Sequence, residues 1–125
     1  MISFTTLKNS ARFARHGLFI VWREEQNFRV EIVAAILAII CGVLLSFTVI
    51  ELSIVSLLIG CILAMECANS ALERLLDIIK PRVSEYVRSI KDIIAAMMLI
   101  LVITSLLVTI FLYIPKLINL FTIVI

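Results

Sequence analysis

The sequence predicts an all-α integral membrane protein, in which an N-terminal amphipathic surface helix precedes three transmembrane helices. Two observations carry this fold class. Hydrophobic residues make up 63% of the 125 residues, whereas a soluble domain is nearer half apolar. Long apolar runs also recur along the chain, and about 20 such residues suffice to cross a bilayer as a helix. A soluble globular domain is therefore excluded.

Three apolar runs define the predicted membrane spans. Residues 32–50 supply 19 residues without a charge, and residues 93–114 supply 22. Residues 52–72 form a further run of 21 residues, in which Glu66 is the only charged side chain. Because Glu51 alone separates the first two runs, we expect a tight turn around it. The whole chain, residues 1–125, is predicted to form a single small helical domain.

Residues 1–31 are predicted to form a surface helix and the cytoplasmic approach to the first span. Apolar residues recur there at alternating spacings of three and four, and Lys8, Arg12 and Arg15 fall on the other side. This pattern is typical of a helix lying on an anionic membrane surface. Packing on loops of a soluble partner would give the same pattern, but the basic charge beside a span favours the membrane. No signal peptide is expected, because the first long apolar run begins only at Ile32.

The placement of basic residues predicts the orientation. Five of the 11 Lys and Arg residues precede the first span, and five more lie between the ends of the second and third spans. Lys116 is the last of the 11. Basic loops stay on the cytoplasmic side of the membrane. We therefore expect a multi-pass protein with a cytoplasmic N-terminus and an external C-terminus.

The connection between the second and third spans carries two local signals. Pro81 is expected to end the second helix near Ile79, because proline disfavours helical backbone at the preceding residue. Residues 81–89 would then form a short polar connection. The stretch Ser89-Ile-Lys-Asp92 resembles a capping box, which predicts the start of the third helix.

A polar stripe lies on the last turns of the second predicted helix. At 100° per residue its members fall within about 80° of one another; they are Glu66, Asn69, Glu73 and Asp77. The predicted topology brings eight of the nine acidic residues to this same interface, Glu25 among them. Charged groups near hydrocarbon are costly and usually face a bundle interior or a wet, functional cavity. Hydrogen bonds that fix an oligomer would also explain the stripe, but its position opposite Glu25 favours a functional site.

These residue types suit phosphate chemistry. Carboxylates and an amide supply the hard oxygen ligands of Mg²⁺, which also shares phosphate oxygens. A carboxylate can take a proton from a hydroxyl group, and Lys91 beside Asp92 can neutralise phosphate charge. Together these features suggest phosphoryl transfer at the membrane surface. The chain has neither a phosphate-binding loop nor a kinase glycine-rich loop, so spacing alone leaves a proton or ion pathway, or a non-enzymatic assembly subunit, as alternatives.

Three stretches resemble signatures of the prokaryotic diacylglycerol kinase and undecaprenol kinase family. Residues 66–77 match the pattern E-x-x-N-[ST]-A-x-E-x-x-x-D, and residues 25–31 look like the family's E-x-x-F-R motif. Lys91-Asp92 is similar to its K-D pair at the start of the third span. The separations between the motifs also agree, and the resemblance covers nearly the whole chain.

The resemblance implies a membrane kinase that transfers the γ-phosphoryl group of ATP to a lipid hydroxyl. Glu66 would be the catalytic base that takes the hydroxyl proton. Glu25 and Glu73 would hold Mg²⁺ together with the nucleotide phosphates, and Asn69 would support that cluster.

The resemblance also implies the nucleotide contacts and the assembly. Lys91 and Asp92 would contact ATP, and Phe13 lies where family members place an aromatic that contacts the nucleotide. The protein would be a homotrimer of the bacterial inner membrane, with active sites shared between subunits at the cytoplasmic interface. No nucleic-acid partner is expected.

The acceptor predicted from the resemblance is diacylglycerol, which would become phosphatidic acid, with undecaprenol as the alternative. Glu31 after the F-R pair resembles the diacylglycerol kinase branch. Asn27 before Phe28 resembles the undecaprenol kinase branch.

Overall fold

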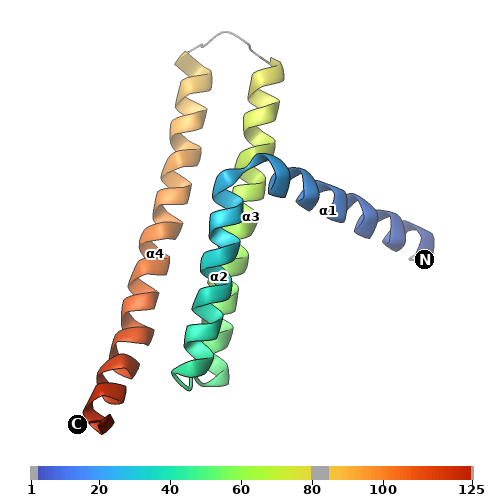
Figure 1. The fold of residues 1–125 in the computed structure, drawn as a ribbon. Coiled ribbons are helices and arrows are strands. Elements are labelled where there is room, and N and C mark those ends of the chain that lie inside the picture. The colour runs from blue at the N-terminus through green and yellow to red at the C-terminus, as the bar shows by residue number, and fades with distance from the viewer. Residues whose placement is uncertain (1–2, 80–84, 125) are drawn as a thin grey trace.

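The computed structural model describes residues 3–79 and 85–124, and within these ranges the chain forms four helices. They are α1 (Phe4–Glu24), α2 (Gln26–Leu44), α3 (Val49–Ile79) and α4 (Glu85–Val124). α3 contacts both α2 and α4 to form a bundle, and α1 projects away from it (Figure 1). The predicted all-helical class and N-terminal helix are confirmed.

Three of these helices are long and apolar enough to cross a membrane, which confirms the predicted number of spans. At about 1.5 Å per residue, the 31 residues of α3 and the 40 of α4 measure about 46 and 60 Å. Both exceed the hydrocarbon layer of about 30 Å. Their ends therefore extend beyond the apolar layer, where charged side chains can be accommodated.

The segment predicted to hold the surface helix and the approach to the first span, residues 1–31, is divided at Glu25 into α1 and the start of α2. Glu25 has extended backbone angles (φ −97°, ψ 115°), although its N–H still donates to the Val21 carbonyl at 2.8 Å. A guanidinium then satisfies the last carbonyls of α1: Arg29 Nη1 donates to those of Trp22 and Arg23 at 2.9 and 3.0 Å. These bonds complete the helix end. Residues 26–31 accordingly belong to α2.

The turn between the first two spans lies at residues 45–48, and not around Glu51 as predicted. Ser46 has a φ of 54° in the left-handed region. Its N–H donates to the Val43 carbonyl, and the Phe47 N–H donates to that of Gly42, both at 3.0 Å. This pair of bonds is the Schellman arrangement, which ends a helix. α2 therefore stops at Leu44 although the apolar run continues to Ile50.

Glu51 belongs to the first turn of α3, where it forms a capping box with Thr48. The Glu51 N–H donates to Thr48 Oγ1 at 3.2 Å, and the Thr48 N–H donates to Glu51 Oε2 at 2.6 Å. Each residue thus satisfies a backbone donor that a helix N-terminus leaves unpaired. The acid that separates the apolar runs starts α3 and is not the centre of the turn.

An aromatic cluster ties α4 to this turn. The ring of Phe47 lies 4.6 Å from that of Tyr113, measured between centroids, and Tyr113 Oη donates to the Ala38 carbonyl at 2.7 Å. Lys116 Nζ lies 3.3 Å from Glu51 Oε2 and 5.8 Å from the Phe47 ring centroid. Phe47 is only 8% exposed. The cluster fixes the end of the bundle remote from the acidic stripe.

We expect Phe47→Ala to lower the free energy of unfolding by about 3 kcal/mol, because a buried ring is lost and a cavity remains. Unfolding in mixed detergent micelles, followed by circular dichroism, measures this change. Phe111→Ala is the matched control, since Phe111 on α4 is 70% exposed. Equal stability of the two variants would show that the Phe47 cluster does not hold the bundle together.

The start of α4 differs from the prediction. Residues 85–89 are already helical, so the predicted polar connection over 81–89 is too long and Ser89 does not begin the helix. Polar residues tolerate an exposed helical turn, which makes a capping pattern ambiguous. α3 is described as far as Ile79, where its end was expected, whereas Pro81 lies outside the described residues. α4 also continues through Pro115, beyond the predicted end at Ile114.

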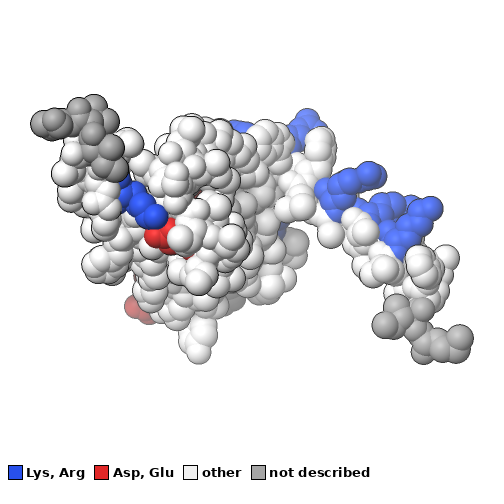
Figure 2. Space-filling view, turned by 90° about the horizontal axis from the view of Figure 1, so that it is seen from below, with Lys and Arg blue, Asp and Glu red and all other residues white. Residues whose placement is uncertain are grey.

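Apolar side chains cover most of the bundle surface. Figure 2 views the bundle from the end that carries the α2–α3 turn. The surface there is largely without charge, while Lys and Arg side chains gather along α1. In the most apolar 18-residue stretch of each spanning helix, only 6–11% is buried against the rest of the chain. Such a surface is suited to lipid or to further copies of the chain.

Candidate functional site

The site begins with two polar side chains that the bundle buries. Glu66 is 3% exposed and Ser70 is 2% exposed, and they are the buried polar residues of the described part of the chain. Both lie on α3, four residues apart, so they occupy the same face on successive turns. A buried carboxylate near the membrane interface is costly unless neighbouring groups or a ligand compensate it.

Other polar groups surround the Glu66 carboxylate. The Asn27 side chain lies close enough to hydrogen-bond it, and the carboxylates of Glu25 and Glu73 lie close enough to interact with it electrostatically. Glu31 interacts with it in the same way. Four carboxylates from α2, α3 and the joint before α2 therefore share one region. Such a concentration of negative charge favours a bound cation.

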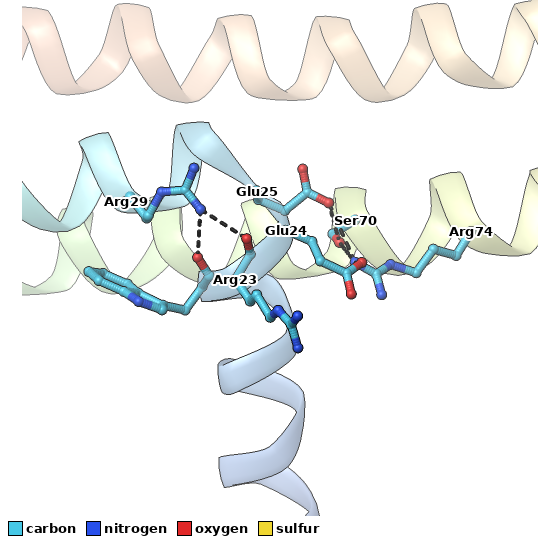
Figure 3. A network of polar contacts seen from close by, with 7 residues as sticks. Arg23, Glu24, Glu25, Arg29, Ser70 and Arg74 are labelled. Carbon is cyan, nitrogen blue, oxygen red and sulfur yellow. Dashed lines mark hydrogen bonds and ion pairs between the residues drawn. The ribbon is translucent and has the colours of Figure 1, made fainter.

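A second group of contacts joins the α1–α2 joint to α3 (Figure 3). Ser70 Oγ donates to Glu25 Oε1 at 2.8 Å. Arg74, one turn further along α3, donates from Nη2 to Ser70 Oγ at 3.2 Å. The same nitrogen lies 3.0 Å from Glu24 Oε2 and 3.6 Å from Glu25 Oε1. These contacts hold Glu25, which caps α2, against the face of α3 that carries Glu66.

The structure brings together part of the predicted site. Glu25 and Glu73 each lie within electrostatic reach of Glu66, and Asn69 is half-buried on α3 with Glu66. Asp77 extends the stripe, but its carboxylate pairs with Lys91 Nζ at 3.6 Å. The predicted α3 stripe therefore exists as a line of polar groups that runs from the buried interior to the exposed end of α3.

Three predicted nucleotide contacts lie apart from this cluster. Lys91 and Asp92 are exposed on α4, and Asp77 is the charged partner of Lys91 among the described residues. Phe13 lies on α1, 65% exposed, with the Arg12 guanidinium 5.6 Å from its ring centroid. One chain therefore does not gather all the predicted site residues.

Sequence reasoning gave no site role to three residues of the contact network, Glu24, Ser70 and Arg74. The spacing indicates two of them, because Ser70 and Arg74 follow Glu66 at intervals of four and so lie on the same helical face as Glu66. The interaction with Glu24 and Glu25 was not visible in the sequence, because it depends on the bend between α1 and α2.

The donor set fits Mg²⁺ only if the nucleotide contributes ligands. Within the described residues, no group of three His, Cys, Asp or Glu side chains is arranged to hold a metal ion by itself. Mg²⁺ commonly takes one or two carboxylates and completes its six ligands with waters and phosphate oxygens. Glu25 and Glu73, which both interact with Glu66, are suitable carboxylates.

An apolar cavity of about 210 Å³ lies between α2, α3 and α4. Apolar side chains make up most of its lining, with Glu31, Ser105, Thr109 and Tyr113 as the polar members. Glu31 Oε2 is buried there and has no hydrogen-bond partner in the described residues. Because Glu31 also interacts with Glu66, the cavity adjoins the carboxylate cluster and suits a ligand that is mainly apolar with one polar end.

The fold and this site together define an integral membrane protein with a carboxylate centre that adjoins an apolar cavity. The model of the prokaryotic diacylglycerol kinase family matches residues 12–113. The chain is also 31% identical over 104 residues to the undecaprenol kinase of Bacillus subtilis (strain 168). The aligned region covers 83% of this chain and 85% of the relative.

The chain therefore belongs to the prokaryotic diacylglycerol kinase family and is a lipid kinase. A kinase of this family takes its phosphoryl group from ATP and works in the membrane that its apolar helices occupy. The absence of a phosphate-binding loop is consistent with this membership, because the polar centre lies on membrane helices.

Proposed function

We propose that the chain phosphorylates the hydroxyl group of undecaprenol, with Glu66 as the base and Mg²⁺-ATP as the donor. The observation that carries the chemistry is the buried Glu66 carboxylate, which two further carboxylates reach electrostatically and which adjoins an apolar cavity through Glu31. A lipid lying in the cavity would present its polar end toward Glu66. Glu66 would take the hydroxyl proton as the oxygen attacks the γ-phosphorus of ATP, while the bond from that phosphorus to the β–γ bridging oxygen breaks and ADP leaves.

Glu25 and Glu73 are the carboxylates proposed to hold Mg²⁺. When bound, Mg²⁺ neutralises phosphate charge and aligns the phosphoryl group for transfer. Ser70 supports this role, since its hydroxyl donates to Glu25 and leaves the other carboxylate oxygen available. Asn69, one turn before Glu73, is proposed to orient the cluster.

We propose that the complete site requires a second copy of the chain, in a homotrimer. Lys91 and Asp92 are exposed and separate from Glu66 within one chain, and most of the apolar helix surface is unburied. A neighbouring α4 would supply its lysine to the phosphates, and Phe13 on α1 would contact the nucleotide. In this arrangement, Lys91 and Asp92 of one chain would complete the site around Glu66 of another.

The site is proposed to face the cytoplasm. The end of α3 and the start of α4 lie at one end of the bundle, and the α1–α2 joint lies beside α3 in the same half of the bundle (Figure 1). Ten of the 11 Lys and Arg residues precede the first predicted span or lie between the second and third, which favours the cytoplasmic side for this end. ATP is available there. The basic face of α1 is then proposed to rest on the anionic surface of the bilayer.

Undecaprenol is preferred to diacylglycerol because the likeness to the Bacillus undecaprenol kinase extends over 83% of the chain. Diacylglycerol is the second candidate. It is favoured by the description of the family and by Glu31, whose buried oxygen can bind a second polar group of a glycerol lipid.

The acceptor is tested by offering undecaprenol and diacylglycerol separately, at equal mole fraction, to purified protein in mixed micelles with Mg²⁺ and labelled ATP. We expect undecaprenol to be phosphorylated faster by at least about tenfold, equivalent to 1.4 kcal/mol. Faster labelling of diacylglycerol would reverse the assignment, and labelling of neither lipid would contradict the proposed function.

The same assay locates the lipid. Ala35→Phe fills the cavity that Ala35 lines. It should therefore raise the KM for lipid by about tenfold while leaving the KM for ATP unchanged. Val33→Phe is the matched control, since Val33 is 56% exposed on the same helix and outside the cavity lining. Equal behaviour of the two variants would exclude the cavity as the lipid site.

A further inference from the structure

The side chain of Arg74, on α3, contacts the α1–α2 joint at Glu24 and Glu25. We propose that Arg74 neutralises the metal-binding carboxylate Glu25 before nucleotide binds, and then binds a phosphate group of the incoming Mg²⁺-nucleotide. This inference rests on the proposed function of Glu25 as a metal ligand. It adds a phosphate-binding residue at a position that the sequence motif leaves unspecified.

The contacts of Arg74 all involve one nitrogen. Nη2 reaches Glu24, Glu25 and the Ser70 hydroxyl at 3.0, 3.6 and 3.2 Å. A guanidinium carries five N–H donors in a planar fork, and its remaining donors make no contact within the described residues. The side chain is 41% exposed. Arg74 can therefore keep a carboxylate partner through Nη2 while its other donors bind an arriving anion.

The reach of Arg74 places its charge near the reacting groups. Side chains in a helix point back toward its N-terminus, and Arg74 accordingly contacts Ser70, one turn before it. Ser70 in turn donates to Glu25, and Glu25 interacts with Glu66. The guanidinium is thus linked through Ser70 to the proposed metal ligand Glu25, which in turn interacts with the proposed base Glu66.

Charge explains why Arg74 would change partners. Mg²⁺ bound at Glu25 would lie close to a guanidinium that is 3.6 Å from the same carboxylate, and like charges at such a distance repel. Glu24, the nearer partner at 3.0 Å, can retain Arg74 when Glu25 takes the metal ion. The phosphates that accompany the metal then supply negative charge, and a guanidinium fork matches phosphate oxygens in geometry.

The proposal distinguishes Arg74 from an ordinary surface ion pair. Exposed pairs usually contribute little to stability, so a purely structural role would leave nucleotide affinity unchanged. A residue that binds phosphate raises the affinity for nucleotide. If it also competes with the metal ion, it lowers the affinity for a divalent cation. Removal of Arg74 should weaken nucleotide binding and strengthen binding of a divalent cation in the absence of nucleotide.

The test measures binding to the purified, full-length protein and not catalysis. Affinity for the β,γ-imido analogue of ATP with Mg²⁺ is determined by calorimetry, and affinity for Mn²⁺ alone by electron paramagnetic resonance. We expect Arg74→Ala to weaken binding of the analogue by about tenfold, the usual effect of losing a charge-assisted hydrogen bond. Mn²⁺ alone should bind Arg74→Ala more tightly than the native chain. Arg74→Lys, which keeps the charge without the planar fork, should show a smaller loss of analogue affinity.

Arg23→Ala is the matched control, since Arg23 carries the same charge next to Glu24 in the sequence, and within the described residues its contact is made by its backbone carbonyl, which accepts from Arg29. If Arg74→Ala and Arg74→Lys bind the analogue as tightly as the native chain, the Arg74 proposal is overturned while nucleotide binding stands. If the native chain itself does not bind the analogue, the proposed function fails, and with it this inference. Weaker binding of Mn²⁺ alone to Arg74→Ala would also overturn the proposal, because Arg74 would then support the metal ion and not compete with it.

Discussion

Glu66→Gln is expected to lower the rate of lipid phosphorylation by at least about a hundredfold, the lower end of the contribution that a positioned general base makes. Glutamine has nearly the same shape and still accepts a hydrogen bond, so Asn27 keeps its partner. It cannot take a proton from the lipid hydroxyl. The change should therefore appear in kcat, while the affinity for nucleotide and the assembly of the protein remain close to native.

The measurement is a steady-state assay with saturating ATP and lipid, together with binding of the β,γ-imido analogue. Glu85→Gln is the matched control, because it removes an acid in the first turn of α4 with the same change of charge. Native kcat in Glu66→Gln would show that Glu66 is not the base, and equal losses in the two variants would indicate a general effect of charge.

Glu25→Ala is expected to produce the second large effect, a loss of activity of about a hundredfold at ordinary Mg²⁺ concentration. Even groups that only orient metal ligands cost about 10–100-fold when removed, and Glu25 is proposed to be a ligand. The loss should be partly reversed at high Mg²⁺, because the phosphates and Glu73 still hold the ion. Activity measured across a Mg²⁺ titration tests this expectation.

Glu25→Asp is the companion variant, since it keeps the carboxylate on a shorter side chain. It should recover part of the activity and require less Mg²⁺ than Glu25→Ala. If Glu25→Ala has native activity with an unchanged Mg²⁺ requirement, Glu25 does not bind the metal ion, and the role of Arg74 beside it must be reconsidered.

The helices were predictable from the sequence because the length of an apolar run is a property of composition. Their ends were not, because hydrogen bonds outside that pattern determine them. Ser46 ends α2 through its left-handed backbone, and the Arg29 guanidinium ends α1 by binding two carbonyls. Hydropathy detects neither arrangement, so the first predicted span, residues 32–50, runs past the end of α2, whereas the other two lie within α3 and α4.

The site was predictable as far as one helix defines it. The four stripe residues, Glu66, Asn69, Glu73 and Asp77, share a face of α3 by periodicity alone. The contacts of Ser70 and Arg74 with Glu25 depend on how α1 bends into α2, and no spacing in the sequence reports that bend. The position of Lys91 relative to Glu66 depends further on how chains associate, so it stays a prediction.

The central claim is that the Glu66 end of the bundle transfers the γ-phosphoryl group of ATP to a membrane lipid. Its most direct test is mass spectrometry of undecaprenol after incubation with purified protein, Mg²⁺ and ATP that carries heavy oxygen in its γ-phosphoryl group. We predict a lipid phosphomonoester that contains the heavy oxygen, formed by the native chain and nearly absent with Glu66→Gln. Folded native protein that binds nucleotide but leaves every offered lipid hydroxyl unmodified would contradict the account.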